Sequence, residues 1–265
     1  MPSNDHVPWR TVAFPVEHGG WGFLFEPILL GMLLAPTAAG LGLSVMIVAS
    51  FLLRHPVKLF WRHRRRLAES PRGRAAWKIS LVYALFALGG LALAVAAAGP
   101  TPLLPLLVMA PLVLVYLFYD STKQARRLLP ELAGPLGLAA IAPAVAVAAG
   151  WSWLSASALW IILTARTIPS IFYVRARLRL ERGKPTRAAP VIINHVIFTA
   201  VVALLAWRGL APSLAVVAVG VLFARAALGL SPLRRSAKAT RIGFSELGYG
   251  LFYVAMTVVG FWVEW

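Results

Sequence analysis

The sequence predicts an all-α, polytopic membrane protein. Of its 265 residues, 60% are hydrophobic and only 13% are charged, and the mean hydropathy is +0.77. Soluble domains are about half apolar and about a quarter charged, so a water-soluble enzyme is excluded. A disordered chain is excluded too, because disordered segments are poor in hydrophobic residues.

Long apolar runs are the second observation. A helix that crosses the hydrocarbon needs about 20 apolar residues. Proline inside such runs is compatible with membrane helices, because neighbouring helices can hydrogen-bond the freed backbone groups. We expect one transmembrane domain over residues 1–265 with nine spans, near 20–37, 40–55, 79–99, 102–120, 132–149, 153–173, 191–208, 212–230 and 246–263.

The distribution of charge is the third observation. The net charge is +17, and the basic runs lie between the apolar segments. This pattern favours the positive-inside rule and contact with anionic lipid headgroups over nucleic-acid binding. Nine Lys and Arg fall between Arg54 and Lys78, whereas the loops near residues 38, 100 and 151 carry no charge. We therefore expect a multi-pass membrane protein with a cytoplasmic N-terminus and lipids as partners.

The basic loops also indicate an internal repeat. A shift of 113 residues places Pro56 on Pro169, and Arg62-x-Arg-x-Arg66 on Arg175-x-Arg-x-Arg179. A shift of 115 residues places Glu131 on Glu246. Either shift spans four helices, so the halves share one orientation, as in parallel transporter repeats. We expect residues 40–150 and 153–263 to form two four-helix units, with one additional helix.

Ionisable side chains within spans or at their ends are costly and tend to be functional. Glu26 lies one turn into the first span, and Arg225 lies inside the eighth. Each could instead form an internal ion pair or extend to the lipid phosphates. The candidate general bases are Glu17, His18 and Asp120, and the candidate binding residues are Arg54, Lys123, Arg126, Arg166, Tyr173, Arg175, Asn194, His195, Arg241 and Glu246.

These residues predict a polar pocket in the cytoplasmic third of the bundle. Arg54 and Arg166 are its best candidates for holding an anionic headgroup, because the guanidinium fork matches phosphate and carboxylate. Several other chemistries have no support. The chain has no cysteine, no GxxxxGK[ST] loop, no HExxH pair and no GxSxG elbow, and its five histidines lack metal-ligand spacing.

The opening PVEHGGWGFLFEPILLG resembles the start of the YwiC-like family of bacterial membrane proteins, with its Pro-x-Glu-His-Gly-x-Trp pattern at Pro15–Trp21. The segment RTIPSIFYVRARLRLERGK is also similar to that family. The resemblance implies a multi-pass protein of the bacterial inner membrane and brings no settled activity.

A more distant resemblance is to the UbiA superfamily of intramembrane prenyltransferases, which have nine helices in two four-helix repeats. The segment YDSTKQARRLLPELAG is similar to the stretch after their fourth helix. Their Asp-rich magnesium motifs have no counterpart, since Asp5 and Asp120 are the two aspartates of this chain. We therefore expect no magnesium site and predict no cofactor.

Three functions remain open from the sequence. The first is a UbiA-like prenyl or quinone-lipid transferase, or a non-catalytic binder of an isoprenoid or quinone-like amphiphile derived from one. In it, Arg54, Lys123 and Arg166 would take over the charge role of the metal. The second is a small-anion transporter, which the parallel repeat suits. The third is a structural membrane subunit without a ligand.

Overall fold

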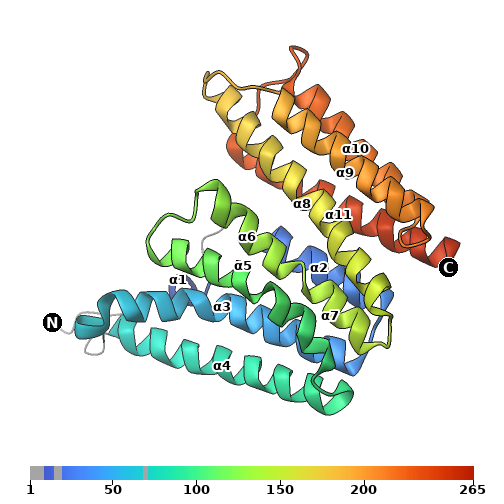
Figure 1. The fold of residues 1–265 in the computed structure, drawn as a ribbon. Coiled ribbons are helices and arrows are strands. Elements are labelled where there is room, and N and C mark those ends of the chain that lie inside the picture. Colours follow the sequence, from blue (N-terminus) through green and yellow to red (C-terminus); the bar gives the residue numbers. More distant parts are fainter. Residues whose placement is uncertain (1–8, 15–19, 68–70) are drawn as a thin grey trace.

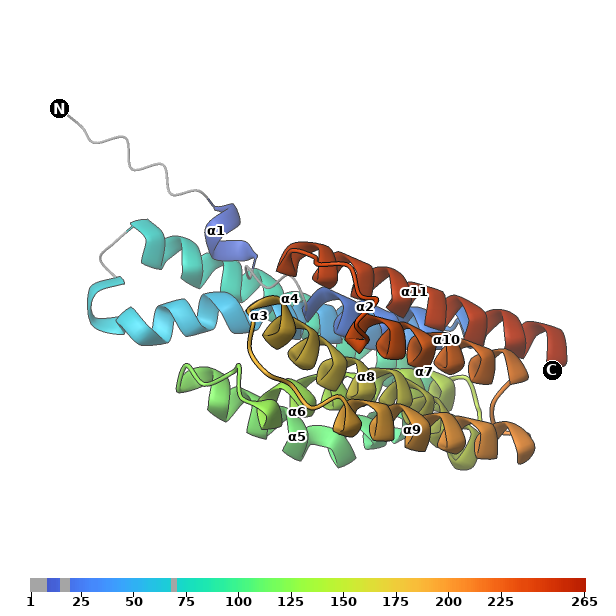
Figure 2. The same cartoon turned by 90° about the horizontal axis from the view of Figure 1, so that it is seen from above.

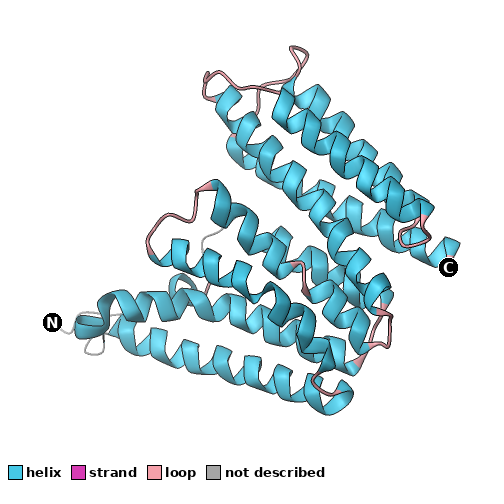
Figure 3. Ribbon diagram, viewed as in Figure 1, coloured by secondary structure: helices cyan, strands magenta, loops and turns pink. Residues whose placement is uncertain are grey.

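The computed structural model describes residues 9–14, 20–67 and 71–265, with side chains described except for residues 62–67. All regular elements in these ranges are helical (Figure 3). A helix satisfies its own backbone hydrogen bonds, which hydrocarbon cannot do for it. The expected all-α class is confirmed.

The helices follow the apolar runs along the chain, and several of them extend beyond the predicted spans. The short α1 (Arg10–Ala13) precedes α2 (Gly20–Leu34), α3 (Ala38–Leu67) and α4 (Pro71–Ala98). After a 3₁₀ turn, η1 (Thr101–Leu103), come α5 (Leu104–Ser121), α6 (Leu128–Leu138) and α7 (Ile141–Ala148). The remaining helices are α8 (Trp153–Glu181), α9 (Ala189–Trp207), α10 (Ser213–Leu230) and α11 (Ala239–Glu264).

Eight helical segments of the described chain are long and apolar enough to cross a membrane, if α6 and α7 count as one. The apolar α2 is shorter, with 15 residues. At 1.5 Å per residue it extends about 22 Å, less than the roughly 30 Å of hydrocarbon. Pro36 accounts for this early end, because a residue before proline avoids the helical region. The expected first span of 20–37 is therefore too long, and the count of nine spans stays a prediction.

The fifth predicted span, 132–149, is two helices that meet at Ala139 and Ala140. Pro143 explains the break, because it lacks an N–H and its ring clashes with the carbonyl four residues earlier. The Leu136 carbonyl instead accepts a 3.0 Å hydrogen bond from the indole N–H of Trp160 on α8. Ala139 and Ala140 are at most 2% exposed. The irregular backbone is thus enclosed by protein, as membrane depth requires.

The helices form two groups with α2 between them. Helices α3 to α7 make one group and α8 to α11 the other (Figure 1). Helix α2 packs against α6 and α7 of the first group and against α11 of the second. In the perpendicular view, the α3–α4 pair projects beyond the longer helices on the side of α1 (Figure 2). A residue on α2 can therefore contact both groups.

Glycine determines how closely α3 and α4 approach. A Cβ atom at Gly42 would lie 2.6 Å from the carbonyl oxygen of Gly90, and one at Gly90 would lie 2.5 Å from that of Gly42. Real Cβ atoms do not come this close to backbone oxygen, so each position requires glycine. Small residues that let backbones approach are the usual means of packing helices in membranes.

The basic loops gather at one end of the bundle. The C-terminal end of α3 and the connections after α5, α8 and α10 lie at this end, and the connections after α4, α7 and α9 lie at the other with the C-terminus (Figure 1). Strong asymmetry between the two ends is what the positive-inside rule uses. The cytoplasmic assignment of the charged end and the duplication over 40–150 and 153–263 stay predictions.

Candidate functional site

The centre of the molecule holds an ion pair between Glu26 of α2 and Arg166 of α8. Their side chains are 2% and 3% exposed, and Nη2 of Arg166 lies 2.8 Å from Oε1 of Glu26. The same Nη2 donates a 2.9 Å hydrogen bond to the backbone carbonyl of Glu246 on α11. A Cβ atom at Gly250 would overlap both charged groups. Glycine at this position of α11 therefore makes room for the pair.

A second ion pair adjoins the first. Nη1 of Arg225, on α10, lies 2.6 Å from each carboxylate oxygen of Glu246. The guanidinium lies between the rings of Tyr173 and Tyr249, 4.2 and 5.2 Å from their centroids. A Cβ atom at Gly229 would overlap the Tyr173 hydroxyl. This second glycine admits the ring that covers Arg225.

We call Glu26, Arg166, Arg225 and Glu246 the central cluster. It joins α2, α8, α10 and α11, and its two positive and two negative charges balance. Desolvating a charge costs on the order of several kcal/mol unless a partner compensates. In membranes such residues pair with one another and mark functional sites. Pairing explains how the charges are tolerated, but their buried position still has a cost.

The pairing in the central cluster leaves buried hydrogen-bonding atoms without a partner in the described part of the chain. Arg166 keeps Nε, and Arg225 keeps both Nε and Nη2. On neighbouring α9, His195 is fully buried, with Nδ1 2.9 Å from the Val191 carbonyl and Nε2 without a partner. Buried polar groups are almost always satisfied. Three guanidinium nitrogens and one ring nitrogen here lack a hydrogen-bond partner among the described residues, and Oε1 of Glu26 has its ion pair with Arg166 but no hydrogen bond.

The structure brings Arg166 and Glu246 of the candidate set together, with Tyr173 against Arg225. It buries His195 on α9, whereas the neighbouring Asn194 is only partly buried and donates to the Pro190 carbonyl of its own helix. The candidate bases Glu17 and His18 lie outside the described residues.

Other candidates belong to a second group on α3 and α5. Arg54 contacts the Phe51 and Tyr116 rings and donates to the Tyr116 hydroxyl. Asp120 is paired with Lys58 at 2.5 Å. The carboxylate of Asp120, a candidate general base, is thus engaged in an ion pair.

The last candidates lie at the charged end, in loops or near the ends of helices. Arg175 of α8 is 2.5 Å from Glu131 of α6 and donates to the Arg126 carbonyl. Lys123 is exposed in a tight turn with φ of 60°, and Arg241 is exposed near the start of α11. The described candidates are therefore distributed over several places, and Arg166, His195 and Asp120 are buried.

Sequence reasoning left two members of the central cluster out of the candidate set. Glu26 and Arg225 are both lone charges inside apolar runs, and this signal was visible in the sequence. Their partners could not be read from the sequence, because Glu26 contacts a residue 140 positions away. Gly229 and Gly250 gave no signal, since glycine is frequent in membrane helices.

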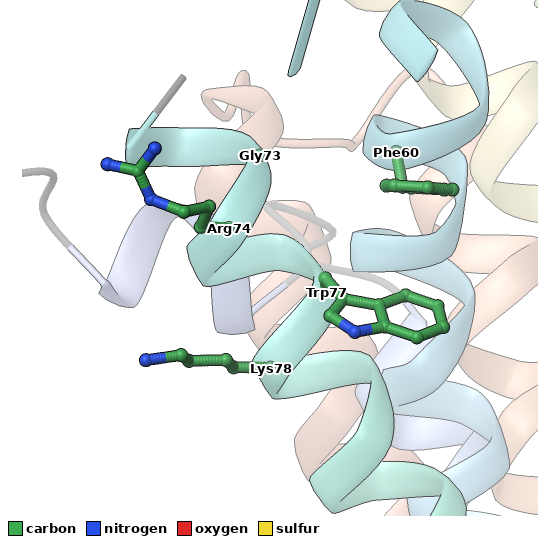
Figure 4. A pocket seen from close by; sticks show the side chains of 5 residues that line it. All are labelled: Phe60, Gly73, Arg74, Trp77 and Lys78. Atoms are coloured by element: carbon green, nitrogen blue, oxygen red, sulfur yellow. The ribbon is translucent and has the colours of Figure 1, made fainter. Parts of the chain in front are cut away.

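Two open hollows lie near the charged end, apart from the central cluster. One, of about 380 Å³, is lined by Phe60, Gly73, Arg74, Trp77 and Lys78. Figure 4 shows the Phe60 and Trp77 rings beside each other between α3 and α4, whereas the charged groups of Arg74 and Lys78 extend from the other side of α4. The other hollow, of about 480 Å³, lies between α8, α9 and their connection.

These features define the class of protein: a multi-pass α-helical membrane protein with a buried, charge-balanced polar centre. A family model, described as YwiC-like protein, matches residues 14–146. This match covers half of the chain, so the protein belongs to the YwiC-like family. No curated protein and no solved structure matches the chain.

Proposed function

We propose that this protein binds the polar head of an isoprenoid- or quinone-like amphiphile inside the membrane, at the central cluster. One observation carries the proposal: Arg166 and Arg225 keep three buried donor nitrogens without an acceptor in the described part of the chain. Leaving such groups unpaired costs about 1–3 kcal/mol each. A headgroup with several oxygen acceptors would satisfy them, and its apolar tail would lie among the surrounding helices.

The charges of the central cluster indicate which kind of headgroup would fit there. Arg166 and Arg225 are already neutralised by Glu26 and Glu246, so an acceptor-rich head of low charge suits the cluster best. His195 adds an acceptor, because a neutral ring that donates from Nδ1 to the Val191 carbonyl presents a lone pair at Nε2. A headgroup with carbonyl and hydroxyl groups would accept from the arginines through its carbonyl oxygens and donate to Nε2 of His195 through a hydroxyl. No magnesium enters this proposal.

Binding is favoured over group transfer by the state of the described carboxylates. A transferase needs a general base near the substrate. Asp120 is paired with Lys58, and the two glutamates of the central cluster are paired with arginine. The proposal is therefore a lipid-binding protein with the layout of a prenyltransferase.

Native mass spectrometry of the purified protein tests this proposal. The double variant Arg225→Gln with Glu246→Gln removes one ion pair without leaving a charge alone. We expect at least a tenfold loss of the co-purified amphiphile. The control is Arg208→Gln with Glu264→Gln, which makes the same charge changes away from the central cluster, at the end of the bundle that holds the C-terminus. There Glu264 accepts from Ser213 and Arg208 contacts Trp207. Equal retention in both variants, or no bound lipid in the wild type, would leave a structural subunit as the better account.

A second candidate, transport of a small anion, is favoured by the break between α6 and α7. Discontinuous helices line the substrate sites of many transporters. Anion flux into liposomes that contain the purified protein would support transport. Flux no faster than in empty liposomes would reject it.

A further inference from the structure

We infer that the hollow between α8 and α9 binds the phosphate of an anionic membrane phospholipid. This site is separate from the central cluster and independent of its proposed function. Its floor is apolar, formed by Phe172, Ala176 and Val191, and its rim carries Arg179 and Arg187. An apolar floor with a cationic rim matches a lipid at the edge of the hydrocarbon, with its chain below and its phosphate above.

Among the described residues, no carboxylate forms an ion pair with Arg179 or Arg187. Glu181 is the one carboxylate between Arg179 and Val191. Its Oε1 lies 2.8 Å from Arg177, and its Oε2 accepts from Ser236 and from the backbone N–H of Ala237. Glu181 is thus bound to the α10–α11 connection. The hollow is left with a net positive rim, which favours an anion.

Three further features of the hollow suit a phosphate. Arg179 donates one N–H to the Pro185 carbonyl over a long 3.4 Å. A charged acceptor would readily replace this weak bond. The Thr186 hydroxyl, a lining group, is buried without a partner among the described residues. Helix α9 begins beside the hollow after Ala188, with no side chain capping it. Helix N-termini attract anions through their free N–H groups and dipole.

The same hollow recurs in the other half of the chain. Adding 113 to Gly73, Arg74, Trp77 and Lys78, which line the α3–α4 hollow, gives Thr186, Arg187, Pro190 and Val191, and all of these line the α8–α9 hollow. The spacing equals the one that relates the basic loops in the sequence. A hollow at the mouth of a helix pair is therefore a feature of the fold. Because the cationic groups of α4 extend away from theirs (Figure 4), the phosphate is assigned to the α8–α9 hollow.

Binding of dioctanoyl phosphatidylglycerol to the full-length protein in neutral detergent tests this inference by native mass spectrometry. The variant Arg179→Gln with Arg187→Gln should lower binding at least fivefold. The matched control, Arg182→Gln with Lys184→Gln, removes the same charge from exposed positions of the same connection. It should lower binding less than twofold. Dioctanoyl phosphatidylcholine should bind weakly to all forms.

Equal losses in the two variants would overturn the inference, because diffuse attraction would then explain the binding. Displacement of the lipid by millimolar inorganic phosphate would also overturn it, since the site would then recognise free phosphate. The variant Arg179→Lys with Arg187→Lys separates binding from folding. It should keep the unfolding temperature and most of the affinity of the wild type.

Discussion

At the scale of single residues, the central cluster depends on charge balance. The variant Arg166→Gln would leave Glu26 buried beside apolar helices without its cation. Removing one partner of a buried pair costs about 3–5 kcal/mol, so we expect a large fall in the thermal stability of the detergent-solubilised protein.

The double variant Glu26→Gln with Arg166→Gln should recover most of that loss, because no charge is then left alone. Thermal unfolding, followed by the fluorescence of the ten tryptophans, measures both variants. A single variant as stable as the double one would contradict the pairing.

At the scale of helices, the glycine contact between α3 and α4 makes a sharp prediction. Gly42→Ala places a Cβ atom 2.6 Å from the Gly90 carbonyl oxygen, so the helices must separate. Overpacking of this kind costs about 1–3 kcal/mol, visible as a lower unfolding temperature. Gly89→Ala is the matched control, since its Cβ would meet no atom within 4 Å. Equal effects at the two positions would contradict the contact, because alanine by itself favours a helix over glycine.

The break between α6 and α7 makes a second prediction at this scale. Trp160→Phe keeps an aromatic ring but removes the N–H that satisfies the Leu136 carbonyl. Hydrogen bonds between membrane helices contribute about 0.6 kcal/mol on average and up to about 1.7. We expect a loss in that range and faster amide exchange around Ala139 and Ala140. Unchanged exchange there would mean that the break does not depend on this bond.

The helices were largely predictable, because run length and polarity dictate where a membrane helix forms. Two errors have local causes: Pro36 ends α2 early, and Pro143 divides the fifth span. The site was predictable only in part. A lone charge such as Arg166 signals a buried centre, but its partner Glu26 depends on packing between helices far apart in sequence. The sequence therefore indicated the members of a site better than its geometry.

For the whole molecule, the difference in basic residues between the two ends of the bundle predicts how the protein is oriented in the membrane. Reporter fusions after Gly150 and after Lys184 lie at opposite ends of α8. We expect the reporter that works outside the cytoplasm to be active after Gly150, and the cytoplasmic reporter to be active after Lys184. Both fusions on one side would contradict the topology, and reversed activities would contradict the cytoplasmic N-terminus.

In the whole molecule, α2 joins the two helix groups at the central cluster, where we propose that an amphiphile binds. The most direct measurement is a cryo-electron microscopy map of the protein extracted with its native lipids. The account predicts headgroup density within hydrogen-bonding distance of Nε of Arg166 and of Nε and Nη2 of Arg225, continued by a tail between helices. A map in which water or protein atoms alone satisfy these groups would contradict it.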